Sequence, residues 1–167
     1  MGYEEHKQQA PATVSYAVIT VSDSRTEADD ESGKLLEQEL SRNGHRLMFY
    51  AILKNEADTI RAKIEGLLRQ DGLQVIITSG GTGASRQDIT VETLYPFLEK
   101  KLDGFGELFR YLTYQEIGTG SILSRAIAGV ARGKVIICLP GSVNATRLAI
   151  DKIILPEIGH LVREASR

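Results

Sequence analysis

The chain has 167 residues, 42% of them hydrophobic and 25% charged, with a formal net charge of −2 at pH 7. A chain of this length folds as one domain and buries roughly 70% of the surface that it exposes when unfolded. Its slightly acidic balance excludes a broad nucleic-acid-binding face, which is normally basic. No apolar run approaches the roughly 18 residues of a membrane span, and the first residues lack the apolar core of a signal peptide. We therefore expect a cytoplasmic protein with neither nucleic-acid nor membrane partners.

The single cysteine, Cys138, excludes an internal disulfide and a thiolate metal cluster. It lies in the apolar run 135–139, which predicts a buried thiol with a packing role. The histidines are scattered over a terminal extension, a turn and the last helix, so their positions indicate neither a metal site nor a catalytic triad: His6, His45 and His160.

Residues 1–12 are polar and show no periodicity, so we expect a flexible N-terminal extension before a single α/β domain over residues 13–167. Runs of apolar and β-branched residues then predict buried strands at 14–21, 47–53, 74–79 and 134–139. Helical periodicity predicts the remaining elements, in chain order: a helix from Asp29 or Asp30 to Gly44, a helix over 57–68, a helix over 91–98 with Thr90 as its N-cap, an apolar stripe over 105–112, and two helices after Ser142, the last with Pro156 in its first turn.

Alternating strands and helices of 10 to 15 residues predict right-handed crossovers and a mainly parallel sheet that helices cover on both faces. The glycine-rich segment 115–133 fits a short antiparallel excursion from that sheet. Sheets of this class bind ligands in the crevice at the carboxyl ends of their strands. We therefore look for a site where the predicted strands end.

The strongest local signal is the loop Ser79-Gly80-Gly81-Thr82-Gly83, called the glycine loop below, which continues directly from the strand 74–79. Its glycines let the backbone adopt left-handed angles, and successive N–H groups in such a turn form a concavity that binds anions. Ser79 and Thr82 add hydroxyl donors, and Arg86 adds a positive charge. The alternative is a tight strand-to-helix turn without a ligand. The spacing matches neither a Walker A loop nor a dinucleotide fingerprint.

Asp88 follows the glycine loop and precedes the predicted helix 91–98. An acid at this position is favoured by the helix dipole. It also suits a Mg²⁺ ion that bridges nucleotide phosphates and needs an oxygen ligand. Because a carboxylate repels a bound anion, the functional interpretation of Asp88 as a metal ligand is the one that we favour.

Two further loops end predicted strands at the same edge. Pro140-Gly141-Ser142 follows the strand 134–139, and Ser142 is either the N-cap of the next helix or part of a second anion site. Asp23 follows the first strand and either contacts a ligand or closes a turn. The two anchor loops together suit a ligand such as a nucleotide or a pterin with a phosphate tail.

At these residues the chain resembles the MoaB/MogA family of molybdenum cofactor biosynthesis proteins over roughly residues 14–160. The resemblance rests on several segments that occur in the same order: residues 20–25 (TVSDSR), 30–36 (DESGKLL), 79–90 (SGGTGASRQDIT), 104–107 (GFGE), 123–126 (LSRA) and 139–142 (LPGS).

The resemblance implies a three-layer α/β/α sandwich that forms homotrimers or homohexamers. It also implies that the chain binds molybdopterin and adenylylates its terminal phosphate with ATP and Mg²⁺. By the same resemblance, Asp88 is the catalytic and metal-binding carboxylate, and the glycine loop holds phosphate. Ser124 and the Pro140-Gly141-Ser142 loop line the pterin side, and Asp23 lies near the nucleotide.

One position departs from the family pattern. Catalytically competent relatives carry an aspartate just before the second helix, whereas this chain has Asn55 between Lys54 and Glu56. Asn55 is also a suitable N-cap for the helix 57–68, which explains the residue without a catalytic role. The family includes members that bind the pterin without adenylylating it, so the alternative function is that of a non-catalytic oligomeric carrier.

Overall fold

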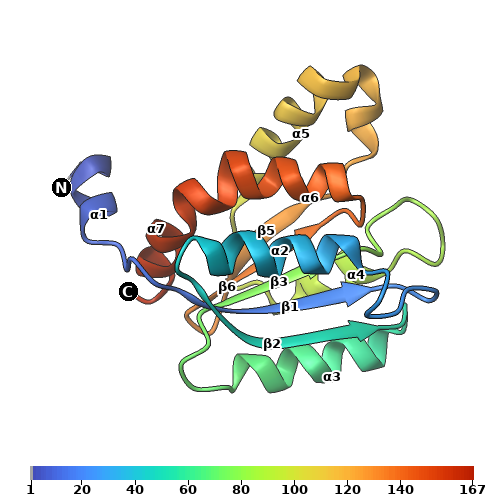
Figure 1. Ribbon diagram of the computed structural model, residues 1–167, viewed down its shortest axis with the longest axis horizontal. Coiled ribbons are helices and arrows are strands. Elements are labelled where there is room, and N and C mark those ends of the chain that lie inside the picture. Colours follow the sequence, from blue (N-terminus) through green and yellow to red (C-terminus); the bar gives the residue numbers. More distant parts are fainter. Residues whose placement is uncertain (1) are drawn as a thin grey trace.

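The computed structural model describes residues 2–167, in which six strands form one sheet in the order β2-β1-β3-β6-β5-β4 (Figure 1). The strands are β1 (Ser15–Val21), β2 (Arg46–Leu53), β3 (Val75–Ser79), β4 (Lys100–Lys101), β5 (Ile127–Ala131) and β6 (Lys134–Leu139). β1 is parallel to β2 and β3, and β3 is parallel to β6. β5 is antiparallel to β4 and β6. The mainly parallel sheet with an antiparallel excursion is therefore confirmed.

The helices over the described residues are α1 (Tyr3–Gln8), α2 (Glu31–Arg42), α3 (Ala57–Leu68), α4 (Thr90–Leu94), α5 (Asp103–Ile117), α6 (Val143–Ala149) and α7 (Leu155–Ala165). Short 3-10 turns occupy Tyr95–Phe97 and Gly118–Leu123, and a π-helical stretch over Ile150–Ile154 connects α6 to α7.

Two hydrophobic clusters lie on opposite faces of the sheet. Tyr16 and Val18 belong to the cluster that contains the buried residues of α2, α5, α6 and α7. Ala17 and Ile19 belong to the cluster that contains those of α3 and α4. Alternate residues of β1 thus point to opposite layers, as the pleat of a strand requires. The predicted three-layer α/β/α sandwich is confirmed.

Helix boundaries agree with the sequence for α2 and differ from it for α4. Asp30 caps α2 by accepting a hydrogen bond from the Gly33 N–H, and Gly44 follows its end with φ +85°. The prediction that Thr90 caps a helix over 91–98 is wrong, because Thr90 is the first helical residue and α4 ends at Leu94. Pro96 has no N–H to continue an α-helical hydrogen-bond ladder, so the chain tightens into a 3-10 turn.

The N-terminal segment contacts the last helix. The Tyr3 hydroxyl and the Lys7 ammonium both donate to Glu157 Oε1, at 2.5 and 3.0 Å. The prediction of a flexible extension over residues 1–12 concerned motion and stays a prediction; Met1 lies outside the described residues.

Helix α5 projects away from the sheet (Figure 1). Some of its apolar side chains are buried and others are exposed. Phe105 and Phe109 are buried, but Leu108 of the predicted stripe is 44% exposed. Within residues 2–167, no helix is both long and apolar enough to cross a membrane.

Candidate functional site

A cavity of about 710 Å³ lies where β1, β3 and β6 end. The loops that follow these strands and β2 line it on one side, and α5 with the turn Gly118–Leu123 lines it on the other. All of the residues predicted for the site line this cavity except Ser79: Asp23, Asn55, Gly80, Gly81, Thr82, Gly83, Asp88, Ser124, Pro140, Gly141 and Ser142. The structure therefore brings together side chains that lie far apart in the sequence.

The glycine loop is tightly packed against the ends of two neighbouring strands. Gly80 and Gly81 have φ of +99° and +67°, which disfavour any residue with a side chain. A Cβ on Gly80 would lie 2.3 Å from the Val21 carbonyl oxygen, and the Gly80 N–H donates to the Leu139 carbonyl at 3.0 Å. The turn is therefore held close to the sheet while it lines the cavity.

Ser79 lies beneath the cavity and does not line it. Its side chain is fully buried, and its Oγ donates to the Pro140 carbonyl oxygen at 3.4 Å. Ser79 thus connects the glycine loop to the Pro140-Gly141-Ser142 loop. The expectation that its hydroxyl faces a ligand does not match this orientation.

Asp88 folds back over the end of the glycine loop. Its Oδ2 accepts hydrogen bonds from Ser85 Oγ at 2.6 Å and from the Ser85 N–H at 3.2 Å. A Cβ on Gly83 would lie 2.5 Å from the same oxygen, so a larger residue there would displace the Asp88 carboxylate from this position. Arg125, which the sequence did not single out as a site residue, donates to the Gly83 carbonyl at 2.9 Å and pairs with Glu92.

Asn55 connects the loops that follow β1 and β2. Its N–H donates to Asp23 Oδ1 at 2.9 Å, and its Nδ2 donates to Asp23 Oδ2 at 3.3 Å. The prediction that Asn55 caps the helix over 57–68 is wrong, since Glu56 occupies that position without a side-chain hydrogen bond. Asp23 holds the neighbouring loop through Asn55 and lines the cavity, and its contact with a ligand stays a prediction.

Three buried side-chain oxygens in this region have no hydrogen-bond partner among the described residues: Asn55 Oδ1, Thr90 Oγ1 and Ser124 Oγ. The first two surround Gly81, since a Cβ built there would lie 2.6 and 2.2 Å from them. Buried polar atoms are normally paired, so such groups at a cavity are suited to contact a ligand or an ion.

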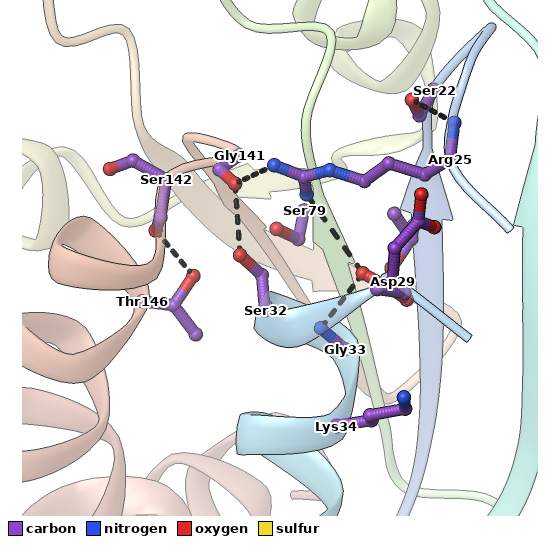
Figure 2. Close-up of polar contacts among 12 residues, drawn as sticks. Ser22, Arg25, Asp29, Ser32, Gly33, Lys34, Ser79, Gly141, Ser142 and Thr146 are labelled. Carbon is purple, nitrogen blue, oxygen red and sulfur yellow. Dashed lines mark hydrogen bonds and ion pairs between the residues drawn. The ribbon is translucent and has the colours of Figure 1, made fainter. Parts of the chain in front are cut away.

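The Pro140-Gly141-Ser142 loop is fixed from two sides. Ser142 caps α6 by accepting a hydrogen bond from the Ala145 N–H at 3.2 Å, so the capping role considered for it is present. The Gly141 carbonyl accepts hydrogen bonds from Ser32 Oγ at 2.9 Å and from Arg25 Nη2 at 3.0 Å (Figure 2). A Cβ on Gly141 would lie 3.1 Å from Gly80 Cα, so the two strand-end loops touch each other.

The far wall of the cavity is largely apolar and was not predicted. Phe109, Ile117 and Leu123 line it together with Thr113. The periodic pattern of α5 indicated a helix but could not indicate which side faces a ligand. Exposed apolar side chains such as Ile117, which is 64% exposed, are visible only once the helix is placed.

A second cavity of about 630 Å³ adjoins the first and shares Ser124 with it. Its lining comes from α4 and the segment that follows it, from α5, and from residues 124–128. The Cys138 thiol, which lines neither of these cavities, stays protonated and unreactive at neutral pH, because burial raises its pKa to about 12. Cys138 is thus a packed core residue, as its apolar surroundings predicted.

Comparison with known proteins places this architecture in a family. A family model described as "Probable molybdopterin binding domain" matches residues 17–160. The chain is 42% identical over 168 residues to molybdenum cofactor biosynthesis protein B of Bacillus cereus, covering 100% of this chain and 99% of that protein. It is 43% identical over 165 residues to the protein of the same name from Bacillus subtilis, covering 98% and 97%.

Solved structures give the same result. A crystal structure of molybdenum cofactor biosynthesis protein B superposes with a TM-score of 0.90 at 42% identity, covering 94% of this chain and 98% of that chain. The tungsten cofactor synthesizing protein MoaB from Pyrococcus furiosus superposes with a TM-score of 0.86 at 38% identity, covering 95% and 100%.

Fold and cavity together define a three-layer α/β protein with a ligand-sized cavity at the carboxyl edge of its sheet. The chain belongs to the molybdopterin-binding domain family, and within it to the MoaB/MogA group of molybdenum cofactor biosynthesis proteins. The family assignment made from the ordered motifs is thereby confirmed.

Proposed function

We propose that this cytoplasmic protein binds molybdopterin in the strand-end cavity and adenylylates its terminal phosphate with ATP. The observation that carries the proposal is the convergence of the glycine loop, Asp88 and the Pro140-Gly141-Ser142 loop on one cavity of about 710 Å³. That volume lies within the range of roughly 300–1,000 Å³ that is usual for small-molecule sites.

Each part of the wall suits one part of the ligands. The backbone of Gly80–Gly83 forms the concavity for phosphate. Ser124, Gly141 and Ser142 bind the pterin side, and the exposed apolar side chains of Ile117 and Leu123 pack against the ring. Asp23 lies nearest to the bound nucleotide in this proposal.

The donor set at the cavity fits Mg²⁺ delivered with a nucleotide. Mg²⁺ takes one or two carboxylates together with substrate phosphates and water, and Asp88 and Asp23 both line the cavity. The unpartnered Asn55 Oδ1 adds a carbonyl oxygen. Within residues 2–167 no group of three or more His, Cys, Asp or Glu side chains forms a metal cage, so the ion and ATP would bind together. When bound, Mg²⁺ would neutralise charge on the phosphates.

The reaction needs no nucleophile from the protein. An oxygen of the terminal phosphate of molybdopterin attacks the α-phosphorus of ATP, the bond to the β-phosphate oxygen breaks, and pyrophosphate leaves. The chain contributes position and charge: the glycine loop holds the attacking phosphate, and Asp88 orients the metal-nucleotide.

The test is mass-spectrometric detection of adenylylated molybdopterin, with pyrophosphate release, after incubation with molybdopterin, ATP and Mg²⁺. We expect Asp88→Asn to lower the rate roughly 100-fold or more, since it removes the carboxylate that would hold Mg²⁺ beside the reacting phosphates. Asp58→Asn is the matched control, because Asp58 lies on the surface of α3 in an ion pair with Arg61. Absence of product from the wild-type protein would contradict the proposed activity.

A second candidate function is that of a molybdopterin carrier without nucleotide chemistry. Asn55 favours it, because by resemblance this residue stands where catalytically competent relatives have an aspartate. Its uncharged amide donates a hydrogen bond to Asp23 and adds no second carboxylate to the site. Tight molybdopterin binding with no ATP-dependent product identifies the carrier.

We propose further that the protein is a homotrimer or homohexamer. Apolar side chains are exposed along α5 and the turn that follows it: Leu108, Tyr111, Tyr114, Ile117, Ile122 and Leu123. Exposed apolar side chains gathered on one helix and its following turn are typical of a contact between subunits. Sedimentation velocity should give a particle of three or six copies of the 18.3 kDa chain, and a monomer would contradict this part of the proposal.

A further inference from the structure

The charges around the cavity are unevenly distributed. Of the described residues that line it, Asp23 and Asp88 are acidic and Arg25 is the sole Lys, Arg or His. Arg86, expected to supply positive charge beside the glycine loop, is exposed and is not part of the lining. Because the net charge of the chain is −2, no general positive field attracts an anion either. Arg125 contacts the Gly83 carbonyl from the adjoining cavity and is paired with Glu92, so among the described residues Arg25 is the one cationic side chain that lines this cavity.

Both the backbone and the side chain of Arg25 are held in place by neighbouring residues. Its backbone N–H donates to Ser22 Oγ at 3.1 Å, and its Nη2 donates to the Gly141 carbonyl at 3.0 Å (Figure 2). Its Nη1 lies 3.9 Å from Asp30 Oδ1, and one third of the side chain (33%) stays exposed. A guanidinium has five N–H donors in a planar fork, and these contacts use only part of them.

Asp30 is the fixed end of this arrangement. Its side chain is 0% exposed and accepts hydrogen bonds from Thr20 Oγ1 at 2.6 Å, Tyr50 OH at 2.5 Å and the Gly33 N–H at 3.1 Å. Burial, and then the hydrogen bond to Asp30, raises the pKa of Tyr50, so Tyr50 stays a donor at neutral pH. A buried carboxylate is costly without a cation, and Arg25 is the cation that pairs with it.

We propose that Arg25 is the anion-binding residue of the cavity, held by Asp30 and the Gly141 carbonyl, and that it binds a phosphate group of the ligand. This inference rests on the proposed function for the identity of that ligand. The phosphate comes either from the tail of molybdopterin or from ATP, and the guanidinium fork suits both.

Calorimetric titration of the full chain with molybdopterin, with the same pterin lacking its phosphate, and with ATP tests the proposal. We expect Arg25→Gln to weaken binding of the phosphorylated source roughly 10- to 100-fold, the usual range for a hydrogen bond to a charged group. Affinity for the dephosphorylated pterin should change by about twofold or less. Whichever phosphorylated probe loses affinity identifies the source of the phosphate.

Three companion variants separate phosphate recognition by Arg25 from support of the neighbouring loop. Arg25→Lys keeps the charge and should keep most of the phosphate-dependent affinity. This variant also tests the role of the charge if Arg25→Gln folds poorly. Arg42→Gln removes the same charge at the exposed far end of α2 and should leave all three affinities unchanged. Asp30→Asn should lower affinity for the phosphorylated probe alone, because the guanidinium loses its ionic partner.

Equal losses on the phosphorylated and dephosphorylated pterin would overturn the proposal, since Arg25 would then only support the Gly141 loop. Unchanged affinity for every probe would overturn it as well. If wild-type protein binds neither pterin but binds ATP in an Arg25-dependent way, the proposed function fails while the role of Arg25 stands. If the wild-type protein binds molybdopterin and Arg25→Gln changes the affinity for neither molybdopterin nor ATP, the role of Arg25 fails while molybdopterin binding stands.

Discussion

Replacing Gly81 with alanine should disturb both the stability of the protein and its cavity. Gly81 has φ +67°, and a residue with a side chain in this left-handed conformation costs about 1–2 kcal/mol. The added Cβ would lie 2.2 Å from Thr90 Oγ1 and 2.6 Å from Asn55 Oδ1, which are both buried. Displacing packed side chains adds about 1–3 kcal/mol. The free energy of unfolding should therefore fall by about 2–5 kcal/mol.

Thermal unfolding measures this loss. For a chain of this size each kcal/mol lowers Tm by about 2–4 °C, so Gly81→Ala should unfold roughly 4–20 °C below the wild type. Gly44→Ala is the matched control, because Gly44 has φ +85° and a Cβ there meets nothing within 4 Å. Gly44→Ala has only the cost of the left-handed backbone conformation, so its free energy of unfolding should fall by about 1–2 kcal/mol.

Ligand binding adds an independent readout. Gly81→Ala pushes Asn55 away from its position in the cavity lining, so molybdopterin affinity should fall steeply, whereas Gly44→Ala should keep it. If Gly81→Ala and Gly44→Ala lower Tm equally, Gly81 is not crowded by Thr90 and Asn55, and the steric part of the reasoning is refuted.

Two further predictions concern charge. Asn55→Asp removes the amide that donates to Asp23 and places two carboxylates side by side, which repel each other. Tm should therefore fall without divalent cations and recover when Mg²⁺ is added. If Mg²⁺ does not change Tm, no cation binds between these residues. His45 accepts a hydrogen bond from the Val14 N–H, and burial lowers the pKa of His45 from 6.5. The unfolded chain then binds the proton more readily, so the stabilisation is complete above pH 6.5 and is lost as pH falls through the lower folded pKa. Unfolding measured from pH 8 to 5 should show this decline for the wild type and not for His45→Asn, and parallel curves would contradict it.

Much of the fold followed from the sequence because its determinants are local. Buried strands appear as short runs of apolar, β-branched residues, and four such runs separated by helical segments lead to a parallel sheet. Gly44 ended α2 where a left-handed residue was expected. The edge strand Lys100–Lys101 carries no apolar pattern, so nothing in its sequence predicts that it pairs with β5. The extent of α4 depended on Pro96 more than on periodicity.

The cavity shows the same division between local and tertiary information. Parallel topology places the ends of β1, β3 and β6 at one edge, so the sequence by itself determined that the glycine loop, Asp23 and the Pro140-Gly141-Ser142 loop meet there. Only the tertiary structure decided which side chains face the cavity. It turned Ser79 inward and paired Asn55 with Asp23, 32 positions away.

Arg25 illustrates the reason. Its guanidinium is placed by the Gly141 carbonyl, 116 positions further along the chain, and by Asp30, whose carboxylate is buried by packing between α2 and the sheet. Sequence periodicity reports the face of one helix or strand, whereas a contact across loops depends on how the strand ends pack together. The sequence therefore determined where ligand chemistry gathers, and packing decided which charge is presented to the ligand.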